Sequence, residues 1–152
     1  MNLSSLKEVR DIAAAENNVL FTSSQPRVLI VDGDHPSVLA VYSMAKSFNS
    51  QIDAANGVEA ALNCLKKSRY DAVITNLEMD GLSGYDLAGW IRDKSPDTGV
   101  IIMTDRDRTE IERYVETGVV DRWIFKPFGE EELRMALDEF VPRDSGDPSG
   151  SD

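Results

Sequence analysis

Short apolar runs alternate along the chain with segments in which apolar residues recur at every third or fourth position. The short runs are Val28–Val31, Gln51–Ala55, Ala72–Ile74, Val100–Met103 and Trp123–Phe125. Runs of this length that are rich in β-branched residues are typical of strands buried on both faces of a parallel sheet. The run Gln51–Ala55 is half polar, so we expect it near a sheet edge.

A helical pattern follows each of these runs. The apolar positions of the five predicted helices are Val38, Leu39, Tyr42 and Ala45; Val58, Ala61, Leu62 and Leu65; Tyr85, Leu87, Ala88, Trp90 and Ile91; Ile111, Tyr114 and Val115; and Leu133, Met135, Ala136, Leu137 and Phe140. Pro36 suits the start of the first helix, and Gly118 suits a left-handed end to the fourth. Alternating strands and helices predict an α/β fold, with a five-stranded, parallel, doubly wound (flavodoxin-like) sheet.

The two ends of the chain differ from this pattern. Residues 1–26 are interpreted as an N-terminal extension, with apolar residues at helical spacing from Leu3 to Leu20 and a linker that ends at Pro26. This extension is either a packed addition to the domain or a helix for partner binding or self-association. Residues 27–141 form the predicted domain. Residues 142–152 contain no apolar side chain, which predicts a disordered tail.

Composition narrows the range of partners. The chain has 152 residues, of which 16 are Lys or Arg and 27 are Asp or Glu, and its formal net charge is −11. This charge disfavours binding to nucleic acid or to an anionic membrane surface. Cys64 is the single cysteine, so an intramolecular disulfide is excluded. With no apolar run near the ~18 residues of a membrane span and no signal pattern, a cytoplasmic location is expected.

Polar side chains follow four of the predicted strands. They are Asp32 and Asp34, on either side of Gly33, after the first strand, Asn76 and Glu78 after the third, Thr104 after the fourth and Lys126 after the fifth. The carboxyl ends of parallel strands meet at one edge, where such sheets bind ligands. Carboxylates suit a hard cation such as Mg²⁺, whereas a lysine and a hydroxyl group stabilise a transferred phosphoryl group.

From about Arg27 to Phe140, these motifs resemble the receiver domains of bacterial response regulators. Position by position, the resemblance implies the first acid of a magnesium pair at Asp32, the switch hydroxyl at Thr104, the phosphate-contacting lysine at Lys126, an aromatic switch at Trp123 and the glycine after the acceptor loop at Gly84. It also implies a cis bond between Lys126 and Pro127. Members of this family accept a phosphoryl group on an aspartate that ends the third strand.

Three positions depart from the family pattern. Asn76 stands at the acceptor position, Gly33 replaces the second acid of the metal pair, and Asp80 replaces the usual proline of the acceptor loop. An amide cannot become an acyl phosphate. With two of about three carboxylates missing, we expect no metal cofactor, or at best weakly held Mg²⁺ at Asp32 and Asp34. A further alternative is that Glu78 reaches this edge and accepts an ion pair from Lys126.

The leading hypothesis is a stand-alone receiver-like module of two-component, or phosphorelay, signalling that has lost phosphorylation and is not an enzyme. No output domain follows the predicted fifth helix, so the module would act by protein–protein contact with a kinase, an effector or a scaffold. The expected contact surface lies on the fourth and fifth helices and includes Trp123, Tyr114, Arg113 and Phe128. A dimer through this surface or through the N-terminal helix is also expected.

Two alternatives remain open at this point. One is an active receiver that uses Asp32, Asp34 or Asp80 as the phosphoryl acceptor. The other is a sensor of a small anion, in which Lys126 and Thr104 bind the anion at the vacated site.

Overall fold

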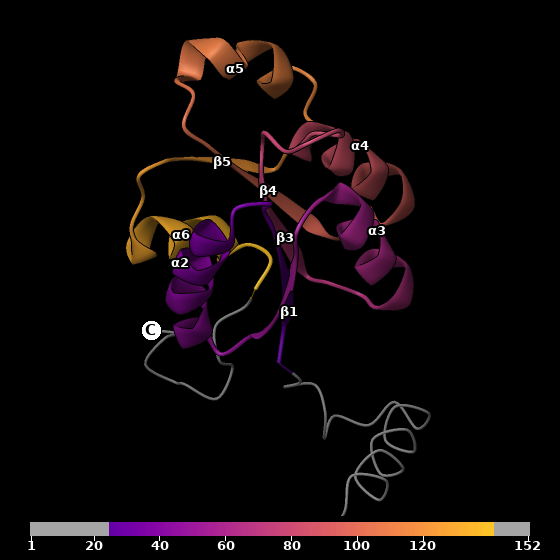
Figure 1. Ribbon diagram of the computed structural model, residues 1–152, viewed down its shortest axis with the longest axis vertical. Coiled ribbons are helices and arrows are strands. Elements are labelled where there is room, and N and C mark those ends of the chain that lie inside the picture. Colours follow the sequence, from indigo (N-terminus) through magenta and orange to yellow (C-terminus); the bar gives the residue numbers. More distant parts are fainter. Residues whose placement is uncertain (1–24, 142–152) are drawn as a thin grey trace, which may run out of the picture. The chain divides into compact units, whose positions relative to one another are not determined.

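The computed structural model describes residues 25–141, so the predicted extension through residue 24 and the predicted tail from residue 142 lie outside the described residues. Five parallel strands form one sheet in the order β2-β1-β3-β4-β5 (Figure 1). The strands are β1 (Arg27–Val31), β2 (Gln51–Ala55), β3 (Ala72–Asn76), β4 (Gly99–Thr104) and β5 (Arg122–Phe125). The predicted fold is confirmed, with the half-polar strand β2 at one edge.

Helices cover both faces of this sheet. They are α2 (His35–Ala45), α3 (Val58–Lys67), α4 (Gly84–Lys94), α5 (Arg108–Val115) and α6 (Glu130–Leu137), and a 3-10 turn, η2 (Lys46–Phe48), follows α2. In Figure 1, α2 and α6 lie on one side of the sheet, and α3 and α4 lie on the other. Within residues 25–141, no helix is both long enough and apolar enough to cross a membrane.

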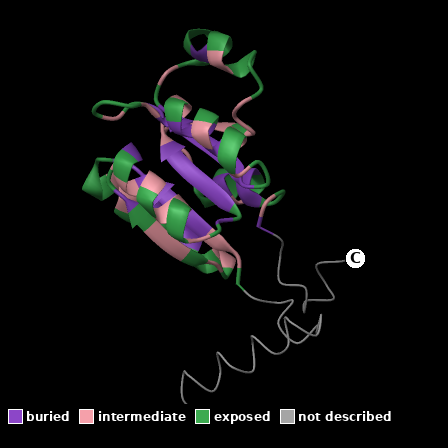
Figure 2. Ribbon diagram, turned by 90° about the vertical axis from the view of Figure 1, so that its right-hand side faces the viewer, coloured by how far each residue is buried: buried purple, intermediate pink, exposed green. Residues whose placement is uncertain are grey.

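The core consists of two apolar clusters, one on each face of the sheet, and Figure 2 shows the buried strands between the helices. Alternate residues of β1 enter opposite clusters: Leu29 and Val31 pack toward α3 and α4, whereas Val28 and Ile30 pack toward α2 and α6. All four side chains have 0% of their surface exposed. Period-two alternation with both faces buried explains why the sequence of a central strand is continuously apolar.

Some apolar side chains that the helical pattern assigned to packed positions are exposed. The exposed fractions are 53% for Leu39, 44% for Tyr42, 50% for Val115 and 64% for Met135. The buried positions of α2 are Val41 and Ala45, so only a narrow stripe of this helix faces the sheet. Because α2 carries no charged residue, its sequence does not distinguish the buried stripe from the solvent-facing side.

Helix α4 begins directly against the end of β3. The Ser83 hydroxyl accepts a hydrogen bond from the backbone N–H of Asp86, and the Asp86 carboxylate accepts one from the N–H of Ser83, which is a capping box. Gly84 follows, and a Cβ atom built there would lie 2.2 Å from the carbonyl oxygen of Asn76. Only glycine permits this approach, which fixes the backbone of the β3 terminus at the predicted site.

Candidate functional site

Asp32 follows β1 and is buried, with 2% of its surface exposed. Its Oδ1 atom accepts a hydrogen bond of 2.9 Å from the backbone N–H of Asp34. Its Oδ2 atom has no hydrogen-bond partner among the described residues and lies 3.9 Å from Nζ of Lys126. The lysine ammonium therefore supplies the positive charge that a buried carboxylate requires.

Asp34 acts as the cap of helix α2. Its Oδ2 atom accepts hydrogen bonds from the Ser37 hydroxyl at 2.6 Å and from the Ser37 backbone N–H at 3.1 Å. These two hydrogen bonds, the hydroxyl bond first, hold the pKa of the Asp34 carboxyl below its ordinary value. An N-cap role accounts for an aspartate just before His35 and Pro36 without any metal ligation.

Asn76 ends β3, and both ends of its side-chain amide are engaged. Its Oδ1 atom accepts a hydrogen bond of 3.1 Å from Nζ of Lys126. Its Nδ2 atom donates one of 2.7 Å to the backbone carbonyl of Glu78. An ammonium can only donate, so the lysine fixes which end of the amide is the oxygen. Lys126 thus bridges the ends of β1 and β3, between Asp32 and Asn76.

Thr104 ends β4 and is also buried, with 2% of its surface exposed. Its hydroxyl oxygen accepts a hydrogen bond of 3.0 Å from the backbone N–H of Arg106, and its carbonyl accepts one of 2.8 Å from the N–H of Lys126. The Arg106 guanidinium donates through Nε to Oε1 of Glu78. This contact raises the pKa of Arg106 further above its ordinary value, because the carboxylate favours the charged form.

The alternative ion pair between Glu78 and Lys126 is not formed. Glu78 pairs with Arg106, whereas Lys126 lies near the Asp32 carboxylate and donates a hydrogen bond to Asn76. Arg106 is the site residue that the sequence reasoning missed. Asn76 pairs with Met103 in the β3–β4 register, so residues two positions beyond Asn76 and Thr104 leave neighbouring strand ends. The opposite charges of Glu78 and Arg106, each two residues past the end of its strand, were the feature of the sequence that could have indicated this ion pair.

These contacts form a closed ring of hydrogen bonds, which we call the rim circuit. It runs through Asn76, Glu78, Arg106, Thr104 and Lys126, and back to Asn76. It joins the loops that follow β3, β4 and β5 using only groups of the protein itself. The structure thus brings together all the strand-end residues that the sequence singled out on these three strands.

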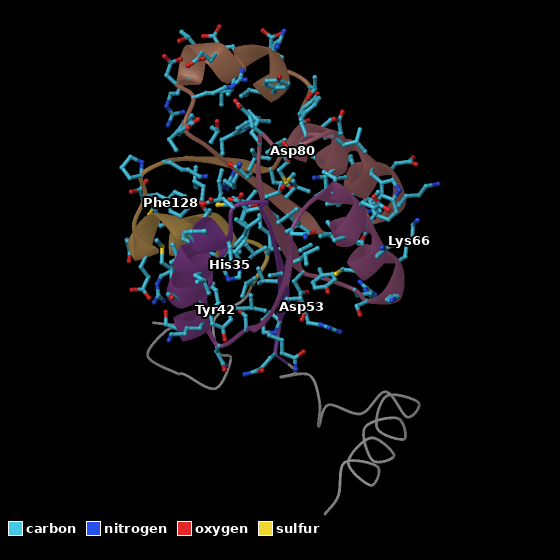
Figure 3. All side chains as sticks on the ribbon, in the orientation of Figure 1. His35, Tyr42, Asp53, Lys66, Asp80 and Phe128 are labelled. Atoms are coloured by element: carbon cyan, nitrogen blue, oxygen red, sulfur yellow. The ribbon has the colours of Figure 1, made fainter. Side chains whose placement is uncertain are left out.

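Gly33 and Asp80 mark the other two departures from the family pattern. A Cβ atom at Gly33 would lie 3.4 Å from the carbonyl oxygen of Asn56, an ordinary contact, and the Gly33 backbone is not left-handed. Local packing therefore does not require glycine there. Asp80 is exposed in the loop between β3 and α4, and Figure 3 labels it near the upper end of the sheet. The Lys126–Pro127 bond is cis, as the resemblance implied.

The donor set at this edge does not fit a firmly held Mg²⁺ ion. Among the described residues, no group of three or more His, Cys, Asp or Glu side chains could hold a metal ion. Asp34 is engaged in capping, Gly33 offers no side chain, and the amide oxygen of Asn76 bonds to an ammonium. The Oδ2 atom of Asp32 accepts no hydrogen bond but lies 3.9 Å from the Lys126 ammonium, so an incoming Mg²⁺ ion would meet a cation where it needs carboxylate oxygens.

An aromatic cluster lies between α4, α5 and β5. The ring centroids of Tyr85 and Tyr114 are 4.7 Å apart, and those of Tyr114 and Trp123 are 6.1 Å apart. The Arg113 guanidinium lies 5.1 Å from the centre of the Tyr114 ring. Phe128 does not join this cluster, because it packs against the apolar cluster on the α2 and α6 face. The predicted contact surface therefore divides between the two faces of the sheet.

Comparisons with known proteins agree with this geometry. The sequence matches the response regulator receiver domain over residues 28–138. The virulence sensor protein BvgS of Bordetella pertussis is 33% identical over 134 residues, which cover 80% of this chain and 11% of BvgS. The chain thus spans a small part of that relative.

Solved structures show the same fold. The chemotaxis protein CheY4 of Vibrio cholerae has a TM-score of 0.71 at 22% identity, and the match covers 78% of this chain and 100% of CheY4. TrrA of Thermotoga maritima, solved in complex with Mg²⁺ and BeF, has a TM-score of 0.69 at 29% identity, covering 77% of this chain and 100% of TrrA. The family match includes every residue of the rim circuit, and the chain belongs to the response regulator receiver domain family.

Proposed function

We propose that this receiver domain serves two-component signalling without accepting a phosphoryl group at the end of β3, and that it acts by protein–protein contact. The observation that carries the proposal is the amide of Asn76, whose oxygen accepts from Lys126 and whose nitrogen donates to Glu78. At this position a phosphoryl acceptor requires an ionised carboxylate oxygen, which an amide does not supply.

The state of Lys126 also supports the proposal. A lysine that stabilises a phosphoryl group must direct its charge toward that group. Here Nζ lies 3.1 Å from Asn76 Oδ1 and 3.9 Å from Asp32 Oδ2. The ammonium of Lys126 already lies near the buried Asp32 carboxylate and donates a hydrogen bond to the Asn76 amide. These two side chains therefore occupy the contacts of Lys126 that a phosphoryl group would need. On this basis the domain needs no cofactor and performs no reaction.

Transfer to another aspartate is disfavoured by the positions of the three candidates. Asp32 is almost fully buried, and Asp34 accepts two hydrogen bonds as the cap of α2. Asp80 is exposed in the loop between β3 and α4, and among the described residues its side chain makes no hydrogen bond or ion pair with Lys126 or Thr104.

A small anion bound by Lys126 and Thr104 is disfavoured because the Lys126 ammonium already lies 3.9 Å from the buried Asp32 carboxylate and donates to Asn76. The cleft on the other side of Asp32 does not offer a second anion site. This cleft has a volume of about 530 Å³ and is lined by Asp32, His35 and Asn56 among others, with no lysine or arginine (His35 is labelled in Figure 3). An anion there would face the Asp32 carboxylate without a cation in the lining.

Protein contact is supported by the aromatic cluster around Tyr114 and Trp123, with Arg113 over it. Aromatic residues and arginine are enriched among the residues that carry binding energy in interfaces. The partner is expected to be a kinase, an effector or a scaffold of a two-component pathway. Dimerisation through the α5 and α6 surface or through the N-terminal extension belongs to the same proposal.

The test is an NMR titration of the ¹⁵N-labelled protein with Mg²⁺ and beryllofluoride, because the related TrrA was solved with these groups. We expect the backbone amide shifts near Asn76, Thr104 and Lys126 to stay unchanged. The control is the double variant Gly33→Asp, Asn76→Asp, which restores both carboxylates and which local packing at residue 33 permits. Saturable shifts at the end of β3 in the unmodified protein would refute the proposal.

A further inference from the structure

Strand β2 leaves one edge of the sheet open. It pairs with β1 on one side, and within residues 25–141 no strand pairs with its other side. The N–H of Gln51 and the carbonyl of Ala55 bond to the residues that flank β1. Because successive residues of a strand direct their backbone groups to opposite sides, the N–H and C=O groups of Ile52 and Ala54 point outward from the sheet.

The sequence of β2 does not block pairing at this edge. Edge strands of natural proteins often avoid association through a lysine, a proline or a bulge. Strand β2 contains no lysine or proline, and its register with β1 is continuous. Its one charged residue, Asp53, accepts a hydrogen bond of 3.1 Å from the Arg27 guanidinium and one of 2.5 Å from the Tyr70 hydroxyl. The charge of Asp53 is therefore compensated within the same molecule.

The side of α2 next to this edge is apolar and exposed. Val38 of α2 lines the same cleft as Ala54 of β2, so this side of the helix lies beside the edge. Tyr42 (labelled in Figure 3) follows Val38 by four residues, and Leu39 precedes Tyr42 by three, so both share this side and both are exposed. Ser47 lies on the opposite side, where it contacts α6.

This region is almost free of charge in a strongly acidic chain. The formal net charge of −11 makes two copies of the chain repel each other over most of their surface. Residues 35–58, which include α2 and β2, contain Lys46 and Asp53 as their only Lys, Arg, Asp or Glu residues. The two charges cancel, so a second copy can approach here without that repulsion.

Two-fold symmetry restricts how two copies of β2 pair. Identical edge strands form one antiparallel ladder around a two-fold axis. An axis beside Asp53 would place two carboxylates opposite each other, which is unfavourable. An axis beside Ile52 instead pairs Ile52 with its own copy and Ala54 with Ser50, and it places Asp53 opposite Gln51. Charge therefore favours the register centred on Ile52, a β-branched residue suited to cross-strand packing.

We infer that β2 pairs antiparallel with β2 of a second copy of this chain, around an axis beside Ile52, so that the two sheets become one. Ile52 packs on the α2 face, so Leu39 and Tyr42 of both copies gather beside the axis and lose their exposure. On the other face, the start of α3 in one copy approaches the end of α3 in the other, where the exposed Glu59 and Lys67 have opposite charges.

This interface is separate from the α5 and α6 surface and does not depend on whether the end of β3 accepts a phosphoryl group. The first test is sedimentation equilibrium of the full chain, which is expected to show a reversible dimer. Tyr42→Glu is expected to weaken dimerisation by about tenfold or more, because it brings two carboxylates to the axis. The matched control is Met135→Glu, which adds the same charge at an exposed apolar residue of α6 and is expected to leave the dimer unchanged.

Cross-linking tests the register. In a Cys64→Ser background, Ile52→Cys is expected to form a disulfide between copies, because Cα atoms about 5.5 Å apart lie within reach of one. Ala54→Cys is not expected to do so, because the two copies of residue 54 lie four residues apart along the ladder, or about 13 Å.

Amide hydrogen exchange tests the pairing without any substitution. As the protein concentration rises, the N–H groups of Ile52 and Ala54 are expected to exchange more slowly, whereas the N–H of Asp53, which points toward β1, is expected to be unaffected. The inference is overturned if the chain stays monomeric or if Met135→Glu weakens the dimer as much as Tyr42→Glu. It is also overturned by cross-linking at residue 54 instead of residue 52, or by exchange at both outward groups that does not depend on concentration.

Discussion

Gly84 and Gly89 lie in the same helix but occupy opposite environments, so the same substitution is expected to change stability in opposite directions. A Cβ atom at Gly84 would lie 2.2 Å from the carbonyl oxygen of Asn76 and 3.1 Å from Cγ2 of Thr75. At Gly89 the same atom would meet nothing within 4 Å. Neither glycine has a left-handed backbone, so conformational strain does not enter the comparison.

At Gly84 the obstacle is a backbone oxygen that cannot rotate away. Displacement of α4 from β3 would also strain the hydrogen bond of 2.8 Å from Gly84 N–H to the Leu77 carbonyl. Overpacking of this kind destabilises by about 1–3 kcal/mol, and we expect Gly84→Ala to lie at or above the upper end. Gly89→Ala removes the helix-interior penalty of glycine and is expected to stabilise by about 0.5–1 kcal/mol.

The measurement is urea unfolding followed by far-UV circular dichroism, with the midpoint and the slope fitted for each variant. The account predicts a lower midpoint for Gly84→Ala and a higher one for Gly89→Ala. It also predicts shifted amide resonances at Asn76 for Gly84→Ala alone. A Gly84→Ala variant as stable as the unmodified protein would refute the close approach of α4 to the β3 terminus.

Two further predictions concern charges at the site and at the helix caps. Lys126→Met is expected to destabilise the domain by about 1–3 kcal/mol, because it leaves the buried Asp32 carboxylate without a cation. Adding Asp32→Asn to this variant is expected to recover part of the lost stability. Urea unfolding that shows no recovery would contradict the coupling between the two side chains. Hydrogen bonds, chiefly from the hydroxyls of Ser37 and Thr109, lower the pKa values of Asp34 and Asp107 in the folded protein. The stability that each carboxylate contributes is therefore fully present above the unfolded-state pKa of about 3.9. This contribution is lost as the pH falls through the lowered pKa of the folded protein. Urea midpoints measured between neutral and strongly acidic pH are therefore expected to fall less for Asp34→Asn and Asp107→Asn than for the unmodified protein; parallel profiles would contradict this assignment.

The fold was predictable because each central strand is short, β-branched and buried on both faces. That pattern shows where each strand ends, and so it identifies Asp32, Asn76, Thr104 and Lys126 as strand-end residues. Parallel pairing then places the carboxyl ends of all these strands at one edge of the sheet, independently of the loop conformations. Gly84 was also predictable, because the family pattern places a glycine after the acceptor loop, and the structure shows why: a side chain there would collide with the Asn76 carbonyl.

The details that could not be predicted depend on which side of an element faces the sheet. Leu39 and Met135 fit a helical period, but their exposure follows from how far each helix covers its face of the sheet. Phe128 follows the last strand, and only the path of the chain shows that it packs on the face opposite Trp123. The Glu78–Arg106 pair depends on loop conformations that local sequence does not determine.

The central claim is that the domain takes no phosphoryl group, and intact-mass spectrometry after incubation with acetyl phosphate and Mg²⁺ tests it most directly. The account predicts an unchanged mass for the protein as it stands and the added mass of one phosphoryl group for the Gly33→Asp, Asn76→Asp variant. A phosphoryl adduct on the unmodified protein, sensitive to hydroxylamine and mapped to Asp32, Asp34 or Asp80, would contradict it.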